Sequence, residues 1–111
     1  MISKAVELAD RIRAEIGDRP GITEIRMFGG YCFMLNGNML VASMKSGELL
    51  VRIPPGGETH ALSRPGAGPM QMGTRTMSGF IGVTDEGIET DEALREWIAY
   101  AEAHVGRMPP K

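Results

Sequence analysis

Residues 26–41 read Arg-Met-Phe-Gly-Gly-Tyr-Cys-Phe-Met-Leu-Asn-Gly-Asn-Met-Leu-Val, and this segment contains the clearest structural signal of the chain. Asn36 and Gly37 stand between two apolar runs, and both residue types tolerate a positive φ. Such a pair predicts a β-hairpin with a two-residue type I′ turn, whose twist matches that of the flanking strands. The preceding pair, Gly29 and Gly30, predicts a bulge, a bend or a tight turn into the hairpin.

The turn also determines which side chains share each face of the hairpin, because side chains alternate along a strand. The expected cross-strand pairs, counted outward from the turn, are Leu35 with Asn38, Met34 with Met39, Phe33 with Leu40 and Cys32 with Val41. One face then carries Tyr31, Phe33, Leu35, Leu40 and Ala42, and the other carries Cys32, Met34, Met39 and Val41. Both faces are apolar.

The next strand, residues 48–53, can follow in two registers. A two-residue Ser46-Gly47 loop pairs Lys45 with Glu48 and places three apolar residues on the Phe33 face. A three-residue loop with a glycine bulge would move them to the Met34 face and make that face the main core. The three residues are Leu49, Val51 and Ile53. We prefer the two-residue loop, which joins opposite charges across the strands.

Helical periodicity flanks the predicted sheet at both ends of the chain. The first helix ends at Gly17, a residue suited to a left-handed C-cap. Its apolar positions are Ile2, Ala5, Ala9, Ile12 and Ile16. Thr90 is the expected N-cap of the last helix, with acidic residues in the first turn. The buried stripe of that helix is Leu94, Trp97, Ile98, Ala101 and Val105.

The intervening segments read as further strands and turns. Residues 22–28 predict a first strand, and residues 70–72 and 76–83 predict weaker strands separated by Gly73. Residues 58–63 predict one short helical turn, and residues 64–69, with two prolines and two glycines, predict a loop.

The resulting order is a helix, five or six strands in succession, and a helix. Consecutive strands joined by tight turns are antiparallel, so the helices pack on the sheet. A chain of 111 residues is expected to form one domain. We therefore predict a two-layer α+β fold, with an antiparallel sheet of about five strands and N- and C-terminal helices packed on it.

The composition indicates the class of protein and its cellular location. Hydrophobic residues make up 42% and charged residues 23%, as in ordinary globular proteins. Every apolar run is interrupted by polar residues, glycine or proline, and the first turns are amphipathic, so we expect no membrane span, no signal peptide and a cytoplasmic location. Cys32 is the only cysteine, which excludes an intramolecular disulfide.

The net charge of −2 is unevenly spread along the chain. Residues 26–84 contain five basic and two acidic residues, whereas residues 85–104 contain seven acidic residues and one arginine. The pattern favours a weakly positive sheet beside an acidic last helix whose exposed face keeps the protein soluble.

No residue pattern points to catalysis, a cofactor or a metal. Cys32, His60 and His104 lack the close spacing of a metal motif, and there is no Gly-x-Ser-x-Gly elbow. Gly29 and Gly30 lack the lysine and the helix of a P-loop. Cys32 is interpreted as a small apolar packing residue within a strand. The sequence thus favours a protein that is not an enzyme.

Direct nucleic-acid binding is the alternative function that the residues raise. The arginines Arg26, Arg52, Arg64 and Arg75, with the aromatic residues Tyr31 and Phe33, would form a basic, aromatic sheet surface. The negative net charge and the presence of only six aromatic residues argue against it.

Methionine is the most unusual component. Seven of the nine methionines fall in the predicted sheet: Met27, Met34, Met39, Met44, Met70, Met72 and Met77. Methionine fills irregular gaps in cores, and it also suits adaptable binding surfaces. If the helices cover the Phe33 face, the other face needs a cover. We therefore predict a homodimer, or a regulatory protein partner, with the hairpin sheet as contact surface. The candidate surface residues are Cys32, Met34, Met39, Val41 and Arg52.

Several of these segments together resemble a known family. They are Met27-Phe28-Gly29-Gly30-Tyr31, the hairpin turning on Asn36-Gly37, Arg75-Thr76-Met77-Ser78 and the closing helix with Trp97. The chain is similar in these segments to the N-terminal domain of the TfoX/Sxy competence regulators, and the similarity covers residues 1–111 as a single domain. The positions that match the family motifs are Phe28, Gly29, Gly30, Tyr31, Arg75 and Met77.

The resemblance implies a two-layer α+β domain with an antiparallel sheet. It also implies a role in bacterial regulators that switch on DNA-uptake genes alongside a cyclic-AMP-dependent activator. Full-length members continue into a helical C-terminal domain, whereas this sequence stops at Lys111. The family pattern supplies no catalytic residue, so the expected function is a non-enzymatic regulatory or protein-interaction domain.

Overall fold

The computed structural model describes residues 3–27, 29–72 and 75–111, and at residues 71, 72, 75 and 76 it describes the backbone. The elements in chain order are α1 (Lys4–Ile16), β1 (Ile22–Met27), β2 (Gly30–Leu35), β3 (Asn38–Ser43), β4 (Leu49–Arg52), α2 (Glu58–Leu62), β5 (Ala67–Met72), β6 (Arg75–Val83), the short 3₁₀ helix η1 (Asp85–Ile88) and α3 (Asp91–Val105). The predicted α+β class is confirmed, with six strands in the sheet instead of about five.

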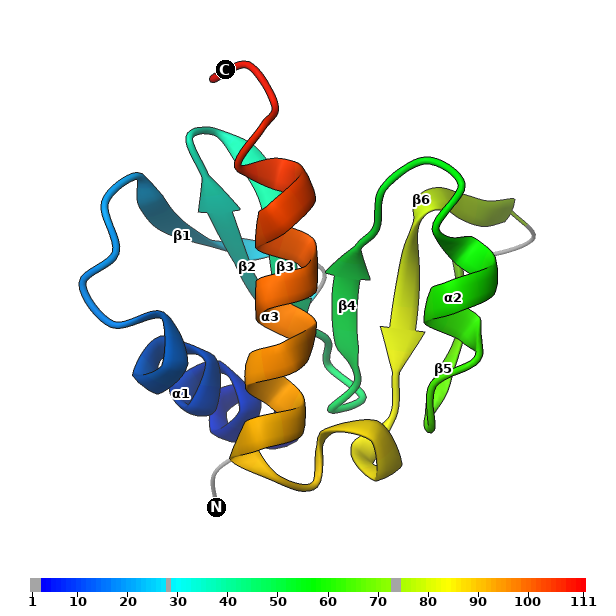
Figure 1. Cartoon of the computed structure of the whole chain (residues 1–111). Coiled ribbons are helices and arrows are strands. Elements are labelled where there is room, and N and C mark those ends of the chain that lie inside the picture. The colour runs from blue at the N-terminus through cyan, green and yellow to red at the C-terminus, as the bar shows by residue number, and fades with distance from the viewer. Residues whose placement is uncertain (1–2, 28, 73–74) are drawn as a thin grey trace.

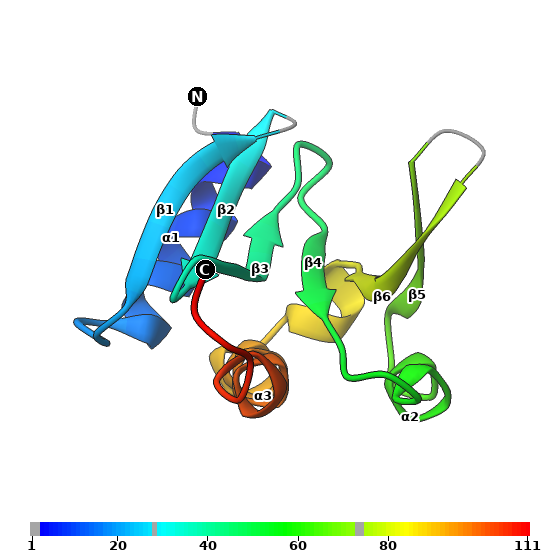
Figure 2. The same cartoon turned by 90° about the horizontal axis from the view of Figure 1, so that it is seen from above.

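The strands form one antiparallel sheet in the order β1-β2-β3-β4-β6-β5 (Figure 1). Helix α3 packs across β3 and β4, and α1 packs beside it on β2 and β3. Figure 2 shows α2 and α3 on the same side of the twisted sheet. The main core lies between this helix layer and one sheet face, which we call the helix-side face. Its largest buried members include Ile12, Phe33, Leu40, Val51, Ile81, Leu94 and Trp97.

The hairpin turn forms as predicted, because Asn36 and Gly37 have φ values of 52° and 84°. The pairs nearest the turn, Leu35 with Asn38 and Met34 with Met39, are confirmed. The register then shifts at a β-bulge on β3, where Leu40 is the extra residue. Beyond the bulge Phe33 pairs with Val41 and Cys32 pairs with Ala42, so the predicted pairs with Leu40 and Val41 are wrong.

The loop between β3 and β4 also differs from the preferred prediction. The Met44 N–H donates to the Glu48 carbonyl oxygen at 2.9 Å, and the Gly47 N–H donates to the Met44 carbonyl oxygen at 2.8 Å. The loop therefore has three residues, with Gly47 at a φ of 94°, and Val51 pairs with Val41.

These two deviations cancel. The bulge at Leu40 shifts the rest of β3 by one residue, so its later side chains exchange faces. The longer loop shifts the pairing of β4 by one residue as well, which compensates for the first shift. The buried residues Leu49, Val51 and Ile53 consequently lie on the Phe33 face, as predicted, although for a different reason.

The flanking elements follow the sequence patterns closely. The Ala93 N–H donates to Thr90 Oγ1 at 3.0 Å, which confirms the N-cap of α3. Gly17 ends α1 with a φ of 62°. The short helical turn is present as α2. The predicted loop over residues 64–69 is shorter than expected, because β5 begins at Ala67, and η1 was not predicted.

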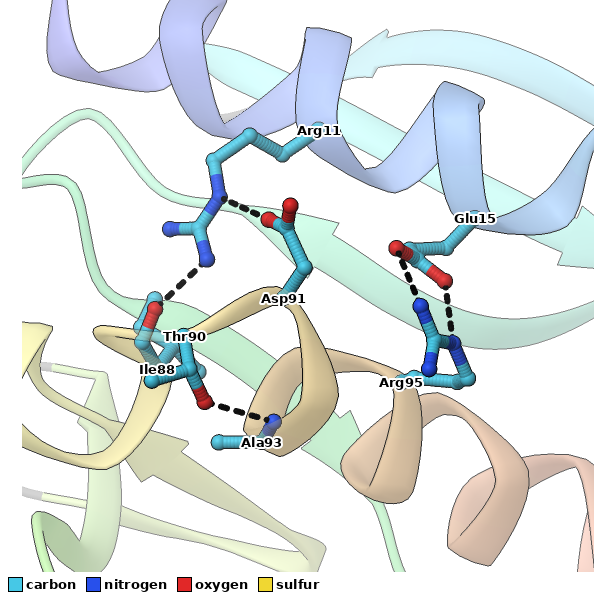
Figure 3. A network of polar contacts seen from close by, with 7 residues as sticks. All are labelled: Arg11, Glu15, Ile88, Thr90, Asp91, Ala93 and Arg95. Atoms are coloured by element: carbon cyan, nitrogen blue, oxygen red, sulfur yellow. Dashed lines mark hydrogen bonds and ion pairs between the residues drawn. The ribbon is translucent and has the colours of Figure 1, made fainter.

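Polar contacts hold α1 against the start of α3 (Figure 3). The Arg11 guanidinium donates to the Ile88 carbonyl oxygen at 2.7 Å and to Asp91 at 3.4 Å. Arg95 donates to Glu15 at 2.7 Å. Two further acidic residues of α3 pair with arginines elsewhere in the chain, Arg64 with Glu96 and Arg19 with Glu102. Part of the acidic charge of α3 is thus balanced within the chain, by arginines of α1 and of the segments that follow α1 and α2.

Candidate functional site

The sheet face opposite the helices carries a second hydrophobic cluster, which we call the methionine face. Its buried members are Cys32, Ala42, Leu50 and Met70, and its partly buried members are Met27, Met34, Met39, Met44, Met77 and Phe80. All ten residues belong to the sheet or its connections, and none belongs to a helix. Within the described residues, no helix covers this face, and its buried members are shielded by the partly buried side chains around them.

The centre of the methionine face is a row of small and apolar residues on adjacent strands. Cys32 pairs with Ala42, Ala42 pairs with Leu50, and Leu50 pairs with Gly82. Long methionine side chains bend over this row. The Met27 sulfur lies 3.9 Å from Cys32 Sγ, and a Cβ added at Gly82 would lie 2.7 Å from the Met70 methyl carbon. The outer surface of the face thus consists of flexible thioether side chains.

The structure brings four of the five predicted surface residues to this face. Cys32, Met34 and Met39 belong to the cluster, and the Arg52 guanidinium lies 5.4 Å from the centroid of the Phe80 ring. Val41 is the exception. It is fully buried on the helix-side face, because the bulge at Leu40 exchanges the faces of Val41 and Ala42.

Sequence reasoning missed other members of the face. Leu50 and Phe80 were not assigned to it, and Met27, Met44, Met70 and Met77 were noted without a face. The alternation of side chains along each strand could have placed them, but only if the register between strands were known. The bulge at Leu40 changes that register by one residue, and no sequence pattern marks it.

A shallow hollow lies beside the methionine face, between α2 and the β5–β6 hairpin. It has a volume of about 290 Å³ and is lined by Leu62, Pro69, Met77, Phe80 and Ile81, among others. Two of these residues, Met77 and Phe80, also belong to the methionine face. Leu62 is one of the exposed large hydrophobic residues, with 41% of its surface accessible. The apolar surface therefore extends from the sheet to α2.

The glycines of the family-like motif have structural roles. Gly29 has a φ of 76°, a conformation that residues with a Cβ rarely adopt. At Gly30 an added Cβ would lie 1.8 Å from the Ser43 carbonyl oxygen. Tyr31 packs at the edge of the main core, whereas Met77 lies on the methionine face. Phe28 and the side chain of Arg75 lie outside the described residues.

The basic, aromatic surface required for nucleic-acid binding is not formed by the arginines whose side chains are described. Arg26 lies over Tyr31 on the helix side of β1, whereas Arg52 lies on the methionine face. Phe33 is only 2% exposed and Arg64 lies over Trp97, so neither belongs to a common open surface with them. The alternation of side chains along a strand separates these residues onto opposite faces.

Cys32 provides a direct test of how well the methionine face is closed. It is 1% exposed, and burial raises the pKa of its thiol, so less of the reactive thiolate is present at pH 8. We expect native Cys32 to react with iodoacetamide about 100-fold more slowly than in guanidinium-unfolded protein. The rate is measured by mass spectrometry.

An exposed thiol elsewhere in the chain serves as the control. Leu62 is 41% exposed on α2, so Leu62→Cys in a Cys32→Ala background should react rapidly in the native state. Equal rates for native and unfolded Cys32 would contradict a closed methionine layer.

No helix of the described residues is long and apolar enough to cross a membrane. In the same part of the chain, no three His, Cys, Asp or Glu side chains lie close enough together to hold a metal ion.

Comparison with curated proteins and with solved structures gave no match, whereas comparison with protein families gave one. The family model of the TfoX N-terminal domain matches residues 15–105, a range that includes all six strands, α2 and α3, but only the final two residues of α1. The chain therefore belongs to the TfoX N-terminal domain family.

Proposed function

We propose that this chain is a non-enzymatic protein-interaction domain of a cytoplasmic bacterial regulator, and that the methionine face binds its protein partner. One observation carries the proposal: the second face of the sheet is apolar across β2, β3, β4 and β6, and among the residues that the structure describes no helical residue contributes to it. A contiguous apolar patch of this kind is the usual mark of a binding surface.

The chemistry of the face suits a protein segment as its ligand. Unbranched methionine side chains adapt their shape to a partner at little cost in strain, and thioethers contact aromatic rings favourably. Arg52 stacked on Phe80 adds two residue types that are enriched at the centres of interfaces. The hollow beside α2 provides a recess for one apolar anchor side chain of the partner.

Family membership supports the regulatory part of the proposal. The TfoX/Sxy regulators that this sequence resembles switch on DNA-uptake genes alongside another activator, so contact with a second protein fits their role. Direct nucleic-acid binding is not favoured, because Arg26 and Arg52 lie on opposite faces of the sheet and Phe33 is buried.

Met34→Lys is the variant that tests this function. Met34 is partly buried within the methionine face, so a lysine there would place a charge in any apolar interface. We expect capture of the partner to fall at least tenfold, which corresponds to about 1.4 kcal/mol or more of binding free energy. The measurement is cross-linking of the tagged chain in extract of the native host, followed by quantitative mass spectrometry of the captured proteins.

Ala103→Lys is the matched control, because Ala103 is exposed on α3 in the helix layer. It adds the same charge away from the methionine face and should leave capture unchanged. Far-UV circular dichroism of both variants confirms that the fold is retained. A set of captured proteins that Met34→Lys leaves unaltered would contradict the proposal.

A further inference from the structure

The two edges of the sheet differ in how readily they accept another strand. Edge strand β5 contains Pro69 and a register shift beside it, two features that hinder pairing. Edge strand β1 pairs with β2 over six residues without a shift and contains no proline. Residues 23–26 are exposed, and Ile25 keeps 42% of its surface accessible. Figure 2 shows β1 at the outer edge of the sheet.

The backbone groups of β1 alternate between β2 and the open edge. The Asn36 N–H donates to the Gly21 carbonyl oxygen at 2.8 Å, which marks a hydrogen-bonded position at the start of the ladder. Hydrogen-bonded positions alternate along an antiparallel pair, so Thr23, Ile25 and Met27 bond to β2. The N–H and C=O groups of Glu24 and Arg26 therefore point away from the sheet and are available to another strand.

We propose that β1 pairs antiparallel with β1 of a second copy of this chain, in the register centred on Ile25. Outward-pointing residues must pair with outward-pointing residues, and among such registers those centred on residue 24 or 25 pair five residues of each strand, more than any other. Centring on Glu24 or Arg26 places like charges opposite each other. Centring on Ile25 places Glu24 of each copy opposite the partner's Arg26, so both charge pairs are attractive.

The environment of these residues supports the same register. Glu24 already accepts two hydrogen bonds from Arg13, at 2.7 and 2.9 Å, and a carboxylate has further lone pairs for a second guanidinium. The two Ile25 side chains, exposed in the single chain, would face each other across the twofold axis.

The pairing joins two six-stranded sheets into one and sets their methionine faces side by side. It assigns the dimer contact to β1, whereas the sequence pattern pointed to the methionine face. It does not depend on the proposed partner of that face.

Disulfide trapping tests the register directly. The two Ile25 residues would form a non-hydrogen-bonded pair with Cα atoms about 4.5 Å apart, within the range that a disulfide bridges. Cys32 is replaced by alanine first, because it pairs with Ile25 across β1 and β2. We expect Ile25→Cys in this background to oxidise to a covalent dimer on a non-reducing gel. Thr23→Cys is the control, since its two copies would be offset by about 13 Å along the strands.

Charge exchange tests the same contact without a covalent bond. Glu24→Arg alone and Arg26→Glu alone each place like charges opposite each other, so each should weaken the dimer at least tenfold. Mixing the two variants restores opposite charges at both pairs and should restore a dimer. Molar mass is measured by size-exclusion chromatography with light scattering, and circular dichroism checks that each variant is folded.

Three results would overturn the inference. They are a monomeric wild-type protein at high micromolar concentration, cross-linking of Thr23→Cys as efficient as that of Ile25→Cys, and a mixture of the charge variants that remains monomeric. The trapping experiment keeps the inference testable if a charge variant does not fold, because it leaves Glu24 and Arg26 intact.

Discussion

Replacing Gly30 by alanine is expected to destabilise the fold by about 3 kcal/mol or more, a large fraction of the stability of a small domain. The added Cβ would lie 1.8 Å from the Ser43 carbonyl oxygen and 2.9 Å from its carbon. Both atoms belong to the backbone of the neighbouring strand, so the clash is relieved only by moving β2 away from β3. Urea unfolding followed by circular dichroism measures the change in the free energy of unfolding.

Gly68→Ala is the matched control for this prediction. Gly68 also lies in a strand, but a Cβ added there would have no atom within 4 Å. We expect its free energy of unfolding to stay within about 0.5 kcal/mol of the wild-type value. If Gly30→Ala were as stable as Gly68→Ala, the close approach of β2 and β3 would be contradicted.

Trp97→Ala is expected to cost about 3–5 kcal/mol, because it removes a large side chain from the centre of the main core. Trp97 is 1% exposed, and it is among the largest fully buried side chains of the chain as described. It joins α3 to the sheet, while the Arg64 guanidinium lies 4.5 Å from its ring centroid and the Tyr100 ring contacts its edge. Thermal and urea unfolding measure the loss.

Arg64→Ala separates the packing of Trp97 from its contact with the arginine. Removing a partly exposed cation over an aromatic ring costs about 0.5–1 kcal/mol. Its effect should therefore be several times smaller than that of Trp97→Ala. Equal losses for the two variants would contradict the view that Trp97 acts mainly by filling the core.

The elements of the fold were largely predictable from the sequence, because their signals are local. Thr90 caps α3 through its own side chain, and the apolar stripe that contains Trp97 has the period of a helix. The limits of β5 were less predictable, since Pro69 and the glycines around it favour a loop. Pairing with β6 overrides that preference and extends the strand back to Ala67.

The existence of the methionine face could be predicted from the sequence, but the residues that form it could be predicted only in part. The number of methionines in the strands indicated a second apolar face, and Met34 and Met39 were placed correctly because they lie next to the turn. Val41 lies beyond the bulge and was assigned to the wrong face. The sequence pattern grouped Arg26 and Arg52 on one surface, whereas their side chains lie on opposite faces of the sheet. The faces of residues on β1 and β4 can be compared only when the register of every strand between them is known.

By itself, the sequence determined the hairpin at Asn36-Gly37, since two residues that accept positive φ specify a type I′ turn without help from the rest of the chain. Which residues beyond Leu40 face the helices depends on the packing of the whole chain. Side chains alternate with a period of two, so a single extra residue reverses every later assignment. Leu40 and Val41 are both apolar, and no local signal marks either as the extra residue. The bulge allows both to be buried beneath the helix layer, which is a property of the packed core.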